Sequence, residues 1–255
     1  MFKAIRIAIL LFILVNVALA TVLAKYRTTD WKQPLRVVIY PLNGDRSEAS
    51  AAYLTSLGDA SFEPIAVFMQ EEGRRYDVAL NEPVQVRLGP VVDELPPAPP
   101  TSGNPLAVMA WSLQLRYWAW RHDTAAGGKP DIRLFVLYHD PATHAVLAHS
   151  LGLEKGLIGV VNAFAAHSMA GSNNMVITHE MLHTLGATDK YEMGSNLPRF
   201  PVGYAEPELA PRYPQRFAEI MAGRIAVSEQ KAVIPDGLAT TLIGTETARE
   251  IRWMK

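Results

Sequence analysis

The residues best suited to chemistry lie in one stretch, His179 to Asp189, which reads H-E-x-x-H-x-x-G-x-x-D. On a helix, positions four apart lie on the same face, so His179 and His183 can present two imidazoles to one metal ion. Glu180 follows the first imidazole, where its carboxylate can reach a water molecule on that metal without being a ligand. This is the arrangement of a zinc hydrolase, which has helical ligands, an open coordination position and a base beside it.

The residues after the second histidine can supply a turn and a third ligand. Glycine tolerates left-handed backbone angles, so Gly186 allows the helix to end and the chain to double back. Asp189 can then return toward the metal. An ordinary amphipathic helix with solvent-facing histidines gives Gly186 and Asp189 no role, so we favour a site for one catalytic Zn²⁺.

Two alternatives remain open at this point. A downstream glutamate could be the third ligand, as in thermolysin-like (gluzincin-type) hydrolases, and the chain offers Glu206, Glu208 and Glu219. The site could also be a non-catalytic zinc site that stabilises a membrane-tethered binding protein. Structural zinc sites usually have four protein ligands, whereas this sequence offers three and a glutamate suited to act as a base.

Composition limits the other functional classes. A chain of 255 residues can hold one sizeable domain, or two subdomains that share a cleft. The formal net charge is −1. The chain therefore lacks the excess of basic residues that is typical of nucleic-acid-binding proteins. The chain has no cysteine, which excludes disulfides, thiolate zinc ligands and a thiol nucleophile. Histidines and carboxylates must therefore form any metal site.

Residues 1–24 have the features of a targeting element. Lys3 and Arg6 precede an uncharged run from Ile7 to Ala24. A helix of that length spans about 27 Å, close to the hydrocarbon thickness of a bilayer. A cleaved signal peptide is the alternative, because Ala18-Leu19-Ala20 resembles a cleavage site. We expect an uncleaved transmembrane helix with its amino terminus inside, and an extracytoplasmic location such as the periplasm; cleavage would make the protein secreted.

Hydrophobic patterns predict the elements that position the motif. After a linker at 25–34, we expect strands at 35–40, 84–88, 132–138, 144–151 and 157–164. We expect helices at 47–75, broken near 58–61, at 106–122, which should be a core helix, and at 245–253. The zinc helix should begin near Asn173 or Asn174. This order predicts an α+β fold with a mixed sheet against which the helices pack. The histidines at 139, 144, 149 and 167 are expected to be structural or exposed.

The motif, together with Glu219-Ile220-Met221-Ala222-Gly223, resembles the metzincin zinc metallopeptidases, in which a methionine turn lies beneath the zinc site. Most metzincins have histidine where this chain has Asp189, and an aspartate there is similar to the snapalysin-like branch. The resemblance implies that His179, His183 and Asp189 bind zinc, that Glu180 is the general base, and that Met221 is the turn methionine.

The resemblance also implies one metallopeptidase domain at 35–255 with two halves. The upper subdomain, 35–186, would be α/β-like, with a twisted mixed sheet and helices ending in the zinc helix. The lower subdomain, 187–255, would be small and irregular, with the methionine turn and a final helix.

We therefore expect a zinc metalloendopeptidase that hydrolyses protein or peptide substrates outside the cytoplasm. Glu180 would take a proton from water and return it to the leaving amine. Tyr191, Tyr204 and Tyr213 are candidates to stabilise the oxyanion. The strand at 157–164 is expected to align an extended substrate by main-chain pairing, as the corresponding edge strand does in metzincins.

Overall fold

The chain has a mixed α+β fold, as seen in a computed structural model. The structure describes residues 28–101, 103–154 and 156–254, together with Arg6, Leu11, Phe12 and Val15. From β1 to α5, the elements follow the order strand, two helices, strand, helix, three strands and helix. The predicted fold class and this predicted order are confirmed.

A five-stranded sheet with the order β2-β1-β3-β5-β4 forms the framework. Four strands are parallel: β1 (Leu35–Asn43), β2 (Val84–Leu88), β3 (Ile132–His139) and β5 (Ile158–Phe164). The fifth, β4 (Leu151–Leu153), is short and antiparallel to β5. β5 therefore lies inside the sheet and β4 forms its edge, so the prediction that 157–164 is the edge strand is wrong.

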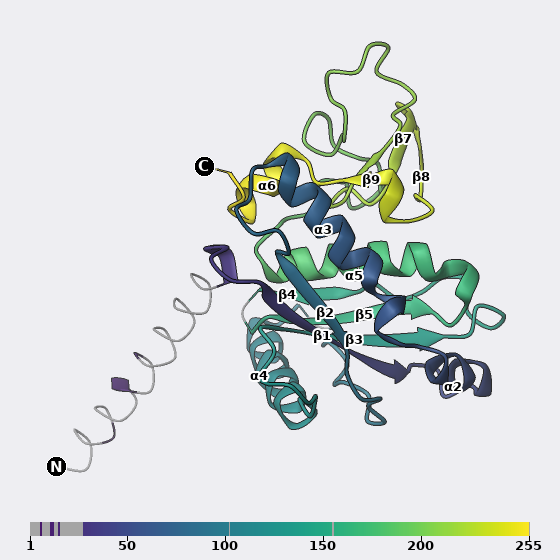
Figure 1. The fold of residues 1–255 in the computed structure, drawn as a ribbon. Coiled ribbons are helices and arrows are strands. Elements are labelled where there is room, and N and C mark those ends of the chain that lie inside the picture. The colour runs from purple at the N-terminus through teal and green to yellow at the C-terminus, as the bar shows by residue number, and fades with distance from the viewer. Residues whose placement is uncertain are drawn as a thin grey trace.

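Helices cover both faces of the sheet (Figure 1). Because side chains alternate along a strand, Val37 and Ile39 of β1 face one side and Val38 and Tyr40 the other. The first side carries α3 (Glu63–Arg75) and α5 (Ala170–Thr184), and the second carries α4 (Pro105–Arg121). α2 (Glu48–Thr55) and a short 3₁₀ turn (Asp59–Ser61) lead into α3. Burial on both faces explains the continuous apolar runs of these strands.

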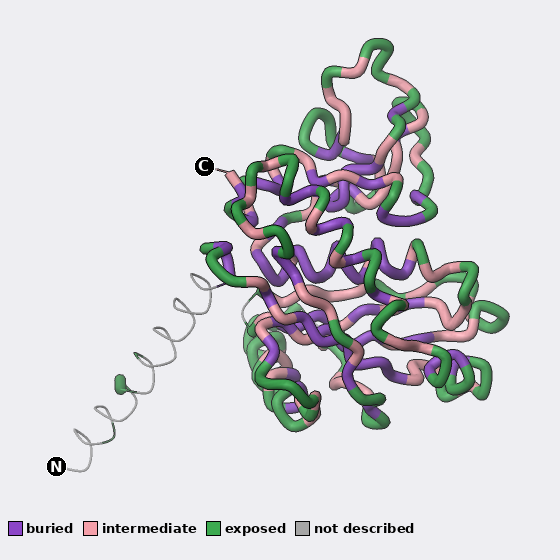
Figure 2. Tube along the Cα trace, in the orientation of Figure 1, coloured by how far each residue is buried: buried purple, intermediate pink, exposed green. Residues whose placement is uncertain are grey.

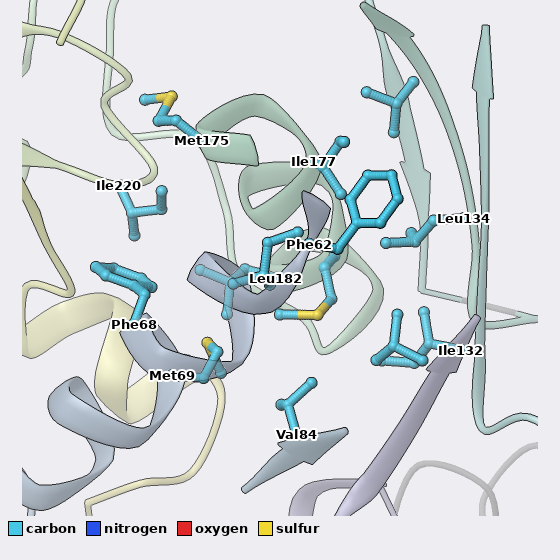
Figure 3. Close-up of a cluster of buried hydrophobic side chains, with 14 of the residues drawn as sticks. Phe62, Phe68, Met69, Val84, Ile132, Leu134, Met175, Ile177, Leu182 and Ile220 are labelled. Atoms are coloured by element: carbon cyan, nitrogen blue, oxygen red, sulfur yellow. The ribbon is translucent and has the colours of Figure 1, made fainter. Parts of the chain in front are cut away.

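The main core holds α5 against the sheet. Ile177 and Leu182 of α5 are fully buried in one cluster with Phe62, Met69 and Leu134, as Figure 3 shows. Burying a side chain of this size stabilises a fold by about 1.5–3 kcal/mol. Packing on this scale fixes α5, and with it the histidine motif, more firmly than helix propensity could.

Residues 187–254 form a smaller part that covers α5 on the side away from the sheet (Figure 1). Its regular elements are short. β6 (Ala218–Glu219) pairs with β9 (Thr241–Leu242), β7 (Ile225–Ser228) pairs with β8 (Lys231–Val233), a 3₁₀ turn covers Leu238–Thr240, and α6 (Thr245–Glu250) follows. Figure 2 shows that most of α5 is buried between the two parts.

The predicted helix at 106–122 exists as α4, but it is not a core helix. Leu115 and Trp118 are buried against the sheet, whereas Trp120 is 70% exposed. The indole N–H of Trp111 donates a 2.9 Å hydrogen bond to the carbonyl of Pro97 in the proline-rich loop. The other exposed apolar side chains of this helix are Leu106, Val108, Met109, Leu113 and Tyr117. A helix that is apolar on all sides resembles a core helix in sequence, which explains the error.

Two predicted boundaries around α5 are also wrong. Residues 144–150 form a loop, and β4 begins only at Leu151. α5 begins at Ala170, after a 3₁₀ turn at His167–Met169. Asn173 and Asn174 lie inside the helix, where Asn173 bonds the backbone of Phe164 and Asn174 bonds the carbonyl of Ser61. These amides therefore satisfy buried backbone groups of neighbouring segments instead of capping the helix.

The predicted membrane anchor is contradicted. Residues 1–24 lie outside the described residues apart from the four isolated positions. In the part of the chain that the structure describes, no helix combines the length and the apolar character needed to cross a bilayer. This finding counts against the predicted transmembrane helix and the membrane-anchored location inferred from it. The predicted linker is partly packed, because the buried indole of Trp31 donates a 2.8 Å hydrogen bond to Ile251.

Candidate metal centre

α5 brings His179, Glu180 and His183 together, with side-chain ligand atoms within 4.8 Å of one another. The two imidazoles come from positions four apart, and their ring centroids lie 4.7 Å apart at an interplanar angle of 81°. His179 and Glu180 are buried, and His183 is partly buried. This group could hold a metal ion.

Two backbone carbonyls set the protonation of both imidazoles. Nδ1 of His179 lies 2.9 Å from the carbonyl oxygen of Ile220, and Nδ1 of His183 lies 2.8 Å from that of Ala187. A carbonyl oxygen can only accept, so each neutral ring carries its proton on Nδ1. Each Nε2 then presents a lone pair, as a metal ligand requires. The hydrogen bond at Nδ1 fixes the direction in which each ring points.

The carboxylate of Asp189 lies close to the Nε2 atoms of both His179 and His183. The chain turns at Gly186, which has a left-handed φ of 103° as predicted. Oδ1 of Asp189 then lies 3.2 Å from Nε2 of His179 and 3.1 Å from Nε2 of His183. Burial would raise the pKa of Asp189, but hydrogen bonds and charge from the two imidazoles, in their protonated form, outweigh this effect and hold the pKa below its ordinary value. The three atoms that the sequence predicted as ligands therefore converge.

The spacing and donor set fit a zinc ion. Two ligand atoms about 2.0–2.1 Å from a tetrahedral zinc lie about 3.3 Å apart, close to the distances between Asp189 and the imidazoles. Oδ1 of Asp189 is buried and has no hydrogen-bond partner among the described residues. Three lone pairs that face one another repel unless a cation lies between them.

Glu180 lies beside these atoms, close to the imidazoles of His179 and His183. Its Oε2 is buried and accepts no hydrogen bond within the described part of the chain. Burial raises the pKa of Glu180, although the charges of His179 and His183 oppose that effect. His149, in the loop before β4, also acts on Glu180 by charge. A carboxylate held in this way can accept and return a proton next to the three converging atoms.

A glycine of the edge strand allows α5 to approach the sheet closely. Gly152 of β4 pairs with Gly159 of β5. A Cβ on Gly152 would lie 2.4 Å from Cβ of His183 and 2.6 Å from the carbonyl oxygen of Glu180. The predicted site residues do not include Gly152, although glycine inside a strand is a known sign of a close backbone approach.

The turn at 219–223 lies against the centre. Met221 and Ile220 are fully buried, and the carbonyl of Ile220 is the acceptor for His179. The carboxylate of Glu219 holds the turn, because Oε2 accepts from the backbone N–H of Ala222 at 2.9 Å. Its Oε1 accepts from Gly244 and from the hydroxyl of Thr247.

A buried ion pair supports the loop of Asp189. Nζ of Lys190 donates to the carboxylate of Glu250 at 2.7 Å and to the carbonyl and hydroxyl of Thr188. Glu250 also accepts from the N–H and hydroxyl of Thr188. The guanidinium of Arg199 donates to the carbonyl of Asp189. No local pattern indicates this network, because Glu250 lies 60 positions after Lys190 in the chain.

The downstream glutamates have other partners. Glu219 uses both carboxylate oxygens within the turn and α6. The carboxylate of Glu206 accepts from the guanidinium and the backbone N–H of Arg216. Glu208 has no contact with the imidazoles among the interactions of the described residues. Asp189, not one of these carboxylates, is the residue beside His179 and His183.

The three predicted tyrosines differ in their relation to the centre. Burial raises the pKa of Tyr191, and the charges of Asp189 and Glu180 add to that effect, so its hydroxyl lies within their field. Tyr204 and Tyr213 instead bond each other, with hydroxyl oxygens 2.8 Å apart. Burial and this bond raise the pKa of Tyr204 to about 12. Tyr191 is therefore the tyrosine that the fold connects to the site.

Comparisons with known proteins do not name a relative. No family model matches this sequence, and no curated protein matches it. A solved structure described as a chaperone-substrate complex aligns with 87% of this chain and 35% of its own chain, at 11% sequence identity and a TM-score of 0.36. A TM-score this low carries no argument, so the chemistry of the centre is the basis for any functional conclusion.

Proposed function

We propose that this protein is a zinc-dependent endopeptidase of the metzincin type. In this proposal His179, His183 and Asp189 hold one catalytic Zn²⁺, and Glu180 is the general base. The main support for this proposal is the position of Oδ1 of Asp189, which lies 3.2 Å from Nε2 of His179 and 3.1 Å from Nε2 of His183. The Nδ1 atom of each ring is already hydrogen-bonded to a backbone carbonyl. A bound zinc ion supplies a Lewis acid that polarises the substrate carbonyl and lowers the pKa of water.

The protein's own groups then move the proton. Glu180 has a buried carboxylate oxygen with no partner among the described residues, next to the ligand atoms. It accepts the proton of the attacking water and gives it to the leaving amine, the role of a general base and then a general acid. A site with three ligands and an unpaired carboxylate fits catalysis better than a closed structural zinc site does.

The neighbouring sheet edge favours an extended peptide as substrate. β4 pairs with β5 on one side, and within the described residues no other strand pairs with its second side. Gly152 of this edge strand lies against the backbone of Glu180, so a peptide paired with β4 passes close to the base. Main-chain pairing of this kind aligns a substrate irrespective of its side chains.

The test compares the full chain with its Glu180→Gln variant on a denatured protein, with and without a chelator. We expect zinc-dependent cleavage by the wild type and a loss on the order of 10²–10⁴-fold in the variant. Zinc content should be unchanged, since Glu180 is not a ligand. Glu192→Gln, in an exposed position on the neighbouring loop, is the matched control. Cleavage retained by Glu180→Gln would refute the mechanism.

A further inference from the structure

A second group of metal-binding side chains lies at the carboxyl ends of two parallel strands. Asp45 follows β1, His139 is the last residue of β3, and His144 lies in the loop after it. Their ligand atoms lie within 4.8 Å of one another. We propose that Asp45, His139 and His144 form a second site for a divalent transition-metal ion such as Zn²⁺, separate from the centre on α5.

A hydrogen-bond chain fixes the lone pair of His139. The amide nitrogen of Asn162 donates to the carbonyls of Ala148 and His149, both at 3.3 Å, so its Oδ1 is oriented as an acceptor. Nε2 of His139 lies 3.0 Å from that oxygen and must donate to it. Nδ1 of His139 therefore carries the lone pair. It is buried and has no hydrogen-bond partner within the described residues, and a cation would satisfy it.

The backbone is shaped around this imidazole. A Cβ on Gly44 would lie 2.7 Å from both Cε1 and Nε2 of His139, so only glycine leaves the ring its place. The carbonyl of Asp140 accepts from the N–H groups of Thr143 and His144, at 3.1 and 3.0 Å. This turn brings the ring of His144 back to that of His139, with centroids 5.2 Å apart.

The same turn positions the carboxylate. Oδ2 of Asp45 accepts from the N–H of Asp140 at 2.6 Å, and Oδ1 accepts from the N–H of Ser47 at 3.0 Å. Nδ1 of His144 lies 3.6 Å from Oδ2 of Asp45 and 2.9 Å from the hydroxyl of Thr143. A carboxylate oxygen can accept more than one bond, so Asp45 keeps capacity for a metal.

The donor set selects the class of ion. Two imidazole nitrogens and one carboxylate suit Zn²⁺ and neighbouring first-row metals, whereas Mg²⁺ and Ca²⁺ prefer oxygen ligands. With neutral imidazoles the group carries one negative charge, which favours a cation. Asn162 links His139 to the carbonyls at 148–149, just before β4. An ion here would therefore hold the loop that leads to the edge strand, which is a structural role.

The experiment measures zinc bound per chain after chelator treatment and equilibration with Zn²⁺ alone. The wild type should bind two ions, and His144→Ala should bind one, because the variant lacks a ligand of the second site. The side chain of His144 is 39% exposed, so its removal should leave the core intact. Asn162→Ala should weaken the affinity of the second site by about 10–100-fold, the usual effect of losing an outer partner of a ligand. Mg²⁺ should not compete.

Two controls separate this site from the centre on α5. His167→Ala removes an exposed histidine outside both groups and should leave two ions. The double variant with His179→Ala and His183→Ala should still bind one ion. The triple variant that also carries His144→Ala should bind none. If the wild type binds a single ion that depends on His179 and His183 and not on His144, the second site is refuted, and Asp45 and His144 form only an ion pair. If instead zinc depends on His144 alone, the second site stands while the proposed catalytic site fails.

Discussion

The backbone N–H of Lys190 donates a 2.9 Å hydrogen bond to the carbonyl of Met221, which ties the residue after Asp189 to the turn at 219–223. The preceding carbonyl of that turn, Ile220, accepts from His179. One turn therefore positions an imidazole of α5 and the loop that carries the nearby carboxylate. The relative placement of His179 and Asp189 is set by backbone groups that lie far from the motif in sequence.

The first prediction concerns the third ligand. Asp189→Ala should weaken zinc binding at the α5 centre by more than the 10–100-fold that losing an outer-shell partner costs, because it removes a ligand atom. The measurement is zinc affinity by competition with a chromophoric chelator, in the His144→Ala background so that only one site is counted. Glu206→Ala, whose carboxylate binds Arg216, should leave the affinity unchanged. An unaltered affinity in Asp189→Ala would contradict the assignment.

The second prediction concerns the pair of Lys190 and Glu250. The side chain of Lys190 is 2% exposed, so Glu250→Gln leaves a buried charge without its partner and should cost about 3 kcal/mol at neutral pH. Burial raises the pKa of Glu250, but Lys190 and Thr188 outweigh it and hold the pKa below the ordinary 4.5. For an acid with a lowered folded pKa, the stabilisation is present above the unfolded value and is lost as pH falls through the folded value.

The check is urea unfolding of the metal-free chain at about pH 7 and about pH 3. The difference between wild type and Glu250→Gln should shrink on acidification. Glu246→Gln, on the same helix, removes an exposed pair with Arg249 and should change stability by less than about 1 kcal/mol. An equal difference at both pH values would show that the charge of Glu250 is not responsible.

The third prediction concerns the contact between β4 and α5. Gly152→Ala would place a methyl group 2.4 Å from Cβ of His183 and 2.6 Å from the carbonyl of Glu180. The helix or the strand must shift, at a cost of about 1–3 kcal/mol, and the proposed cleavage activity should fall with it. Thermal unfolding and peptide cleavage measure the two effects. Gly194→Ala is the control, since nothing lies within 4 Å of its added Cβ; similar losses in both variants would exclude a specific contact.

The sequence predicted the parts of the fold that depend on local pattern. Helical spacing placed His179 and His183 on one face, and the glycine at 186 predicted the turn that returns Asp189. Apolar runs located β1, β2, β3 and β5 to within a few residues. These features depend on neighbours in the chain, so one sequence is enough to find them.

The remaining features depend on contacts between distant residues. The burial of Lys190 beside Glu250 and the acceptor role of the Ile220 carbonyl leave no local pattern. The loop at 144–150 contains a short apolar run. Its carbonyls at 148 and 149 bond the side chain of Asn162 instead of the backbone of a neighbouring strand, so the loop does not extend β4. Trp120 is exposed although its helix is apolar, because the sheet covers only one side of α4.

The last prediction distinguishes the three tyrosines. Only Tyr191 is connected to Asp189 and Glu180 by charge among the three, whereas Tyr204 and Tyr213 bond each other. If the Tyr191 hydroxyl stabilises the oxyanion, Tyr191→Phe should lower kcat by about 10²-fold with KM and zinc content unchanged, because the bond forms only in the transition state. Tyr213→Phe loses a hydroxyl of the same kind outside this field and should retain nearly full kcat. Steady-state kinetics on one peptide decide the matter: equal kcat in the two variants would remove Tyr191 from the mechanism and leave its raised pKa as a consequence of burial beside two carboxylates.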